Sequence, residues 1–176
     1  MKQKIFILLC TIGICISVHA KKYIVHSPDN KIKVSITADK QLIWSIDYNG
    51  ERILTPSAIQ MNIEGLKIQP GINPVVINAK VDKINAEQIA VVPVKQKTIR
   101  DQYTQLTLIC KGDYNIIFRV YNNGAAYRFE TVLKQSPIIV NSETVELNLI
   151  DGCKAYWPRE KNQEYITHCE AIFDEL

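Results

Sequence analysis

The sequence of 176 residues has few cysteines, and this shortage excludes one class of small exported protein. Of its five cysteines, Cys10 and Cys15 fall in a leader described below, which leaves Cys110, Cys153 and Cys169. Three cysteines allow at most one bridge, so the chain is not a disulfide scaffold. Cys153 and Cys169 are the nearest pair, whereas Cys110 lies in a strand-like run typical of a buried, small apolar residue.

Concentrated charge of one sign is also missing. Without Lys2 and Lys4 of the leader, 19 basic residues stand against 18 acidic ones, and no run of like charge exceeds two residues, as in Lys21-Lys22. A nucleic-acid-binding surface needs a concentrated basic face, and a membrane-binding patch needs a cluster of basic residues. We therefore expect no nucleic-acid partner and, once the leader is removed, no membrane partner.

The short motifs of common enzyme chemistry are absent as well. The sequence has no nucleophile elbow, phosphate-binding loop or zinc-ligand spacing, and only His26 and His168 remain beyond the leader. Acidic residues do gather near the C-terminus: Glu160, Glu164, Glu170, Asp174 and Glu175. Paired carboxylates hydrolyse glycosidic bonds and carboxylates bind calcium, but acids near a polar terminus are also commonly just solvated.

One apolar run is present, at the very start. Residues 1–4 are basic, residues 5–18 are almost entirely apolar, and Val18-His19-Ala20 places small residues before Lys21. This is the pattern of a secretory signal peptide, and its apolar run of about 14 residues is shorter than the roughly 20 of a spanning helix. We expect cleavage after Ala20, export, and one domain over residues 21–176; an uncleaved anchor is the alternative.

The remaining pattern predicts an all-β protein. Residues 32–38 and 42–48 alternate apolar and polar side chains, and Asn49-Gly50 then predicts a tight hairpin with a return strand over 51–54. Residues 55–85 are less regular, and further strands are predicted over 88–94, 105–110, 115–121, 125–130, 137–141 and 144–149. Short, evenly spaced strands are typical of an antiparallel sandwich or barrel. No helical period is evident before Tyr165, and residues 170–176 could form at most one helical turn.

Residues 118–131, FRVYNNGAAYRFET, form the clearest predicted hairpin. Apolar residues lie on both faces of its two arms, so we expect it to be central and covered on both sides. Arg119 and Arg128 would then need partners, of which Glu130 and Asp101 are the nearest in sequence.

Several segments resemble glycoside hydrolase family 97, in the order in which they occur in that family. SPDNK (27–31), the hairpin around Asn49-Gly50 and Pro56-Ser57 are similar to the family's opening strands. IRDQYTQLTL (99–108) resembles its "IRD-x-YNEL" segment, FRVYNNGAAYRFET its "FR-x-YNDG-x-AYRFET" hairpin, and AYWPREKNQEY (155–165) the end of its early sandwich. The similarity spans residues 24–165. Asn123 replaces the aspartate of the family's hairpin.

The resemblance implies a fold and a function. Family 97 enzymes are exported bacterial α-glycosidases, either α-glucosidases or α-galactosidases. Each has a galactose-mutarotase-like β-super-sandwich, then a catalytic (β/α)₈ barrel and a small β domain. Such a barrel needs about 250 residues, whereas eleven residues follow Tyr165. We therefore expect the sequence to stop inside the first domain, with the sandwich incomplete at its C-terminus and no catalytic residue of its own.

One site residue follows from the resemblance. A glutamate in the family's "QEY" element binds a calcium ion beside the active site, and Glu164 matches it; Glu170 is the second choice. Calcium takes six to eight oxygen ligands, so Glu164 alone should not hold the ion. The full enzyme would act on an α-linked oligosaccharide in the bacterial periplasm or at the cell surface, and the hairpin favours the α-galactosidase branch.

Two alternatives remain. The chain could be a stand-alone carbohydrate-binding or adhesion module, with aromatic residues such as Trp44, Tyr121, Tyr156 and Trp157 stacking on sugar rings. It could also be a remnant without a ligand, which would leave bare the face that normally meets the barrel.

Overall fold

The computed structural model describes residues 20–92, 96–134, 137–158 and 170–173, and within these ranges the chain forms strands and turns with no helix. The described residues accordingly include no helix long and apolar enough to cross a membrane. In chain order the strands are β1 (Lys21–His26), β2 (Ile32–Ala38), β3 (Leu42–Tyr48), β4 (Glu51–Ile63), β5 (Val76–Ile89), β6 (Thr98–Cys110), β7 (Tyr114–Tyr121), β8 (Gly124–Thr131), β9 (Val140–Val145), β10 (Ala155–Pro158) and β11 (Glu170–Phe173).

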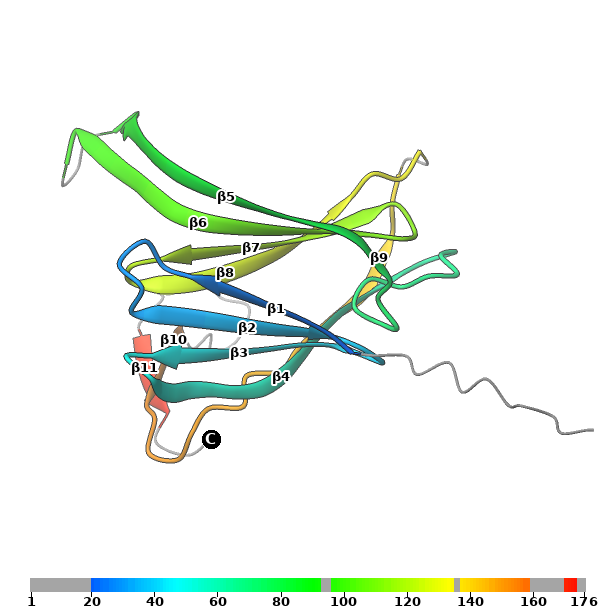
Figure 1. Ribbon diagram of the computed structural model, residues 1–176, viewed down its shortest axis with the longest axis horizontal. Coiled ribbons are helices and arrows are strands. Elements are labelled where there is room, and N and C mark those ends of the chain that lie inside the picture. Colours follow the sequence, from blue (N-terminus) through cyan, green and yellow to red (C-terminus); the bar gives the residue numbers. More distant parts are fainter. Residues whose placement is uncertain (1–19, 93–95, 135–136, 159–169, 174–176) are drawn as a thin grey trace, which may run out of the picture.

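Two antiparallel sheets form the body of the molecule. The first has the order β1-β2-β3-β4-β9 and the second the order β5-β6-β7-β8, while β10 and β11 form a separate antiparallel pair. Figure 1 shows the two sheets stacked as layers, with β5 and β6 curving away from the first sheet at one end. The all-β, antiparallel sandwich predicted from the alternation is confirmed.

The core lies between the sheets and is built from alternate residues. Val34 and Ile36 of β2 are fully buried, as are Ile116 and Val120 of β7. Aromatic side chains fill the centre: Trp44 lies 6.2 Å from Phe118 and 5.5 Å from Tyr127 between ring centroids. Since successive strand residues point to opposite faces, the period-2 pattern predicts which residues share a face, and the stacking of the two sheets decides that this face is buried.

The opening strands follow the sequence closely. β2 and β3 have the predicted bounds, and Asn49 and Gly50 adopt φ values of +50° and +88° between β3 and β4. Two positive φ values are what a type I′ hairpin turn requires. The return strand is longer than predicted, because β4 runs to Ile63.

Other predicted elements were wrong in extent or kind. β1 was missed, although it pairs with β2 along its whole length. Of the strand predicted over 88–94, only residues 88–89 belong to β5, which starts at Val76 in the stretch that looked irregular. Parts of the strands predicted over 137–141 and 144–149 form one strand, β9. Residues 170–173 pair with β10 and are not helical. Nearly all of β5 is exposed, so buried and exposed residues do not alternate along it. Its sequence therefore lacks the period-2 pattern from which strands are predicted.

The predicted central hairpin is also only half right. β7 lies inside its sheet, but β8 is the edge strand, and most of its side chains are only partly buried. Tyr127 of β8 donates a hydrogen bond to Glu143 of β9 at 3.0 Å, which ties this edge to the first sheet. Apolar residues on both faces therefore indicated partial cover and not a central position.

A buried carboxylate on the middle one of three neighbouring strands links these strands of the first sheet. Asp47 of β3 is 4% exposed and lies opposite Lys33 of β2 and Arg52 of β4 in the strand register. Lys33 Nζ is 2.6 Å from Asp47 Oδ2, and Arg52 Nε donates to the other carboxylate oxygen. Burial would raise the pKa of Asp47, but the hydrogen bonds and charges of the two cations together hold it below its ordinary value.

A pH dependence of stability follows from Asp47. A carboxylate with a lowered folded pKa stabilises the fold above its unfolded pKa of about 4, and this contribution is lost as the pH falls through the folded pKa. We expect Asp47→Asn to lower stability at neutral pH and to flatten the loss below about pH 4, measured by urea unfolding across pH. Asp151→Asn, at an exposed turn, is the control. Equal acid sensitivity in parent and Asp47→Asn would contradict this role.

Candidate functional site

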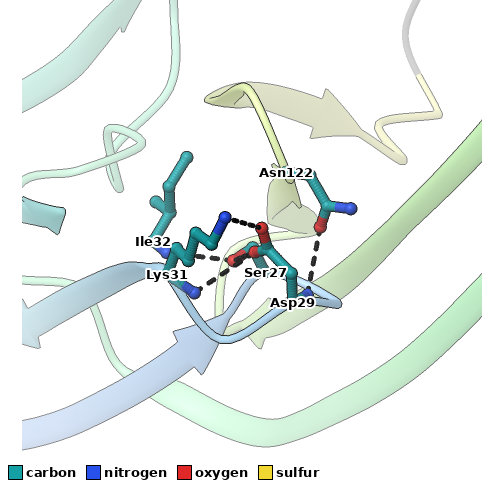
Figure 2. A network of polar contacts seen from close by, with 5 residues as sticks. All are labelled: Ser27, Asp29, Lys31, Ile32 and Asn122. Carbon is teal, nitrogen blue, oxygen red and sulfur yellow. Dashed lines mark hydrogen bonds and ion pairs between the residues drawn. The ribbon is translucent and has the colours of Figure 1, made fainter. Parts of the chain in front are cut away.

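The turn between β1 and β2 is held by its own side chains. Ser27 Oγ donates to Asp29 Oδ1 at 2.6 Å, and it accepts from the amide of Ile32 at 2.9 Å (Figure 2). The same Asp29 oxygen accepts from the amide of Lys31 at 3.2 Å. Asn30 has a φ of +60°, a conformation that asparagine tolerates better than most residues. The SPDNK turn is therefore stabilised by hydrogen bonds from its own side chains.

This turn contacts the second sheet through Asn122, in the turn between β7 and β8. Asn122 Oδ1 accepts from the backbone amide of Asp29 at 3.1 Å, across 93 positions of sequence (Figure 2). On its other side, Lys31 accepts from the amide of Asn49 at 2.8 Å. Residues 27–31, 49–50 and 122–124 thus meet at one end of the sandwich, which we call the turn end.

Asp29 belongs to the structure of the turn end. The hydrogen bond from Ser27 lowers its pKa most, partial burial opposes this, and the amide and charge of Lys31 lower the pKa further. Its carboxylate is thus ionised at neutral pH, and its contacts lie within the turn. An ionised carboxylate occupied in this way braces the backbone and is not a proton donor for catalysis.

A cleft of about 510 Å³ opens beside the turn end, where β5 and β6 diverge from β1. Side chains from β1, β5 and β6 and from the turn line it: Ile24, Val25, His26, Ser27, Pro28, Asn30, Val81, Lys83, Ile84, Asn85, Gln102, Tyr103 and Thr104. No carboxylate is among these described lining residues. Hydrolysis of a glycosidic bond uses a pair of carboxyl groups, which these lining residues do not supply.

The two hairpin arginines have different partners. Arg128 Nη2 lies 3.4 Å from Glu130 Oε1, which confirms one predicted pairing. Arg119 Nε instead donates to Gln105 Oε1 at 2.9 Å, and its guanidinium lies 4.5 Å from the ring centroid of Tyr103. Asp101 does not pair with either, since its carboxylate accepts from Gln88 at 3.0 Å. Arg119 thus clamps β7 to the neighbouring strand β6, whereas Arg128 pairs within its own strand, β8.

The predicted calcium ligand, Glu164, lies outside the described residues. Within the described ranges, no three or more His, Cys, Asp or Glu residues lie close enough together to hold a metal ion. The second choice, Glu170, is described only through the backbone of β11, where it pairs with Pro158. The described residues therefore do not fit a calcium site by themselves, and the ion would need most of its ligands from elsewhere.

The aromatic residues proposed to stack on sugars have different surroundings. Trp44 is 5% exposed and packs in the core, so its prediction as an exposed platform was wrong. Its position on the inner face of β3 follows from the strand alternation. Tyr121 packs against Tyr103 in a tilted arrangement, with ring centroids 5.0 Å apart. The side chains of Tyr156 and Trp157 lie outside the described part, as does Cys169, the nearest cysteine in sequence to Cys153.

The contact between Asp29 and Asn122 was missed from sequence. Its only signal was that two turn motifs of one family, SPDNK and the Asn-Asn-Gly hairpin, both occur in the chain. Neither motif by itself indicates that the two turns meet.

Loss of this contact should loosen the turn end. We expect Asn122→Ala to lower the free energy of unfolding by about 0.5–1.5 kcal/mol, the range for one net hydrogen bond. The amide of Asp29 should also exchange with solvent several-fold faster, measured by hydrogen exchange. Asn123→Ala is the matched control, because Asn123 is an exposed neighbour in the same turn. Equal effects at both positions would show that the contact is not formed in solution.

Comparison with known proteins relates this arrangement to an enzyme family. The family model described as glycosyl-hydrolase 97 N-terminal matches residues 25–175. A retaining alpha-galactosidase of Bacteroides thetaiotaomicron is 35% identical over 133 residues, 73% of this chain and 19% of that protein.

Solved structures share the fold. A glycoside hydrolase family 97 enzyme of Pseudoalteromonas sp. strain K8, in complex with acarbose, superposes with a TM-score of 0.71 at 18% identity over 86% of this chain. A beta-arabinopyranosidase superposes with a TM-score of 0.66 at 21% identity over 76% of this chain. The present chain covers 24% and 22% of those two chains, so it spans about a quarter of the solved relatives or less.

Proposed function

Because the chain belongs to the glycosyl-hydrolase 97 N-terminal family, we propose that it is the supporting β-sandwich of an exported α-glycosidase, working with a (β/α)₈ catalytic barrel outside these 176 residues. The observation that carries the proposal is the match over residues 25–175, which takes in both sheets of the sandwich. The described residues that line the cleft include no pair of carboxyl groups, so the sandwich supplies structure and the barrel supplies the acid and base.

The turn end is the surface we assign to the barrel. It gathers the SPDNK turn and the Asn-Asn-Gly hairpin in one place, through the contact between Asp29 and Asn122. β10 and β11, which flank residue 164 in sequence, lie toward the same end of the long axis (Figure 1). A rigid, hydrogen-bonded end of a sandwich can hold an active-site loop in place, which is what catalytic geometry requires of its support.

An α-linked galactoside is the substrate class we propose for the assembled enzyme. The support is the retaining alpha-galactosidase, which is 35% identical to this chain in sequence. An α-glucoside is the alternative, because acarbose is bound in one of the solved family members.

Glu164 is proposed to give one carboxylate oxygen to a calcium ion whose other ligands come from the barrel. Calcium is a hard cation that binds carboxylates, and one carboxylate is far short of its coordination number. The chain alone should therefore bind calcium negligibly, and a complete site should form only when sandwich and barrel are together.

A chimaera tests both the function and Glu164. Residues 25–175 replace the matching segment of the Bacteroides alpha-galactosidase, and we expect hydrolysis of nitrophenyl α-galactoside, while the 176-residue chain alone releases no sugar. Glu164→Gln in the chimaera should weaken calcium binding by about tenfold or more, measured by calorimetry, since even indirect support of a metal ligand is worth that much. Glu160→Gln is the matched control. A folded chimaera without activity would contradict the supporting function, and unchanged calcium binding would exclude Glu164.

Export is a separate part of the proposal. The mature protein should begin at Lys21, which mass spectrometry of the secreted product would determine. A product that retains residues 1–20 would favour the uncleaved anchor.

The stand-alone binding module makes the opposite prediction for the chain alone. It requires measurable heat when α-galactosides or malto-oligosaccharides are added in calorimetry. We expect none, because Trp44 is buried in the core and Tyr121 packs against Tyr103.

A further inference from the structure

β5 is a long strand with one open edge. Among the strands that the structure describes, only β6 pairs with it, and nearly all of its 14 residues are exposed. The exposed fraction is 55% for Val81 and 74% for Ile89, and the strand contains no proline. Proteins normally shorten, charge or cover such an edge, because its unpaired backbone groups can bind another strand.

The inner face of β5 is uncovered as well. Val81 lies opposite Leu106 of β6, which is 2% exposed, yet Val81 itself is more than half exposed. The cause is that the first sheet ends at β1, which lies against β6 and does not reach over the far part of β5. A strand added beside β5 would extend the sheet and cover apolar side chains that now face solvent.

The charges along β5 identify an occupant, and we propose that it is the β5 strand of a second copy of this chain. Two antiparallel copies related by a two-fold axis at Asn85 place Lys83 opposite Glu87 of the second copy. The same register places Val81 opposite Ile89 of the second copy. These residues are separated by even numbers of positions and therefore lie on one face of the sheet.

The neighbouring registers are worse. An axis at residue 83 or 82 places Lys83 or Asp82 opposite its own copy, and like charges directly opposite are destabilising. An axis at residue 84 or 86 forms no ion pair. An axis at Val81 would pair Lys80 with Asp82 of the second copy, but these two already form an ion pair within one chain at 3.0 Å. Among the described residues, Lys83 and Glu87 form no ion pair within the chain, although Arg100 of β6 lies opposite Glu87 in the strand register.

The product is a symmetric dimer in which two four-stranded sheets join into one of eight strands. Its centre carries two Lys83–Glu87 pairs flanked by two Val81–Ile89 contacts. This interface lies on β5 and is independent of the function assigned to the turn end.

Charge exchange tests the register. In analytical ultracentrifugation of the purified chain from about 1 to 100 µM, we expect a concentration-dependent dimer. Lys83→Glu or Glu87→Lys alone should raise its dissociation constant at least about tenfold, because each change creates two like-charge contacts. The double variant should return to within about threefold of the parent, as expected when opposite charges again face each other. Lys40→Glu, the same charge change in the turn between β2 and β3, should have no effect.

Three outcomes would overturn the proposal. The chain could remain a monomer throughout, the dimer could be insensitive to both single exchanges, or the double variant could remain as weak as the single ones. Circular dichroism of each variant is the control for folding: where the spectrum matches that of the parent, a loss of dimer reports on the interface alone.

Discussion

Replacing Gly71 by alanine is expected to lower the free energy of unfolding by about 3–5 kcal/mol, close to the largest effects of single substitutions. Gly71 has a φ of +84°, and a Cβ at this position would lie 2.3 Å from the carbonyl oxygen of Ile59 and 2.8 Å from Cα of Gln60. A left-handed backbone costs a residue with a side chain about 1–2 kcal/mol. Backbone atoms of β4 cannot move aside as a flexible side chain would, so the clash adds to this cost.

The contacts of this loop explain why it cannot move away. The carbonyl of Gly71 accepts from the amide of Leu42 at 2.9 Å, and that of Pro70 accepts from the amide of Met61 at 2.9 Å. The loop thus fixes the start of β3 against the C-terminal part of β4. A shift that relieved the clash would break these hydrogen bonds, each worth about 0.5–1.5 kcal/mol.

A second glycine separates the cost of the left-handed backbone from the cost of the clash with β4. Gly65 has a φ of +75°, but a Cβ there would have no atom within 4 Å. Gly65→Ala should therefore show the backbone cost alone, about 1–2 kcal/mol in urea unfolding. If both substitutions had the same effect, the close approach of Gly71 to β4 would not exist in solution.

Phe118→Ala is expected to destabilise the sandwich by about 3–5 kcal/mol, the usual cost of removing a buried phenylalanine ring. The ring is 1% exposed and lies at the centre of the core, with Trp44 and Tyr127 both 6.2 Å away between centroids. Domains of this size are stable by only about 5–15 kcal/mol, so this change would remove a large share of the total. Chemical unfolding followed by tryptophan fluorescence would measure it, because Trp44 borders the cavity.

Phe129→Ala is the matched change at the sheet edge. Phe129 lies on β8, is only partly buried and contacts the core through Tyr127 at 5.8 Å. We expect about 1–2 kcal/mol here, because less apolar area leaves the solvent on folding. Equal losses at the two positions would contradict the assignment of β7 as an inner strand and β8 as an edge.

The accuracy of the strands predicted from sequence differs from one strand to the next. β2 and β3 were predicted with correct bounds because Val34, Ile36, Leu42 and Trp44 are buried on one face, and one-sided burial writes a period of two into the sequence. β5 left no such pattern, because it has solvent on both faces over much of its length. β1 was missed although Val25 is buried, since a single core residue in six is too weak a period to recognise.

For the candidate site, too, the sequence predicted some features and missed others. The SPDNK and Asn-Asn-Gly turns were visible as motifs, because their residue types are required by local backbone conformation. Their contact through Asp29 and Asn122 was not visible, since it joins residues 93 positions apart. Glu164 was chosen because it matches a sequence motif of the family, and its position in this fold stays a prediction.

By itself, the sequence determined the β class, the first hairpins and the family, because alternation, turn chemistry and motif order are local properties of the chain. The tertiary structure alone decided that Trp44 is core and not a sugar platform, that Arg119 binds Gln105 and Tyr103, and that β5 has an open edge. The physical reason is that burial and strand partners depend on how two sheets stack, and residues distant in sequence set that stacking.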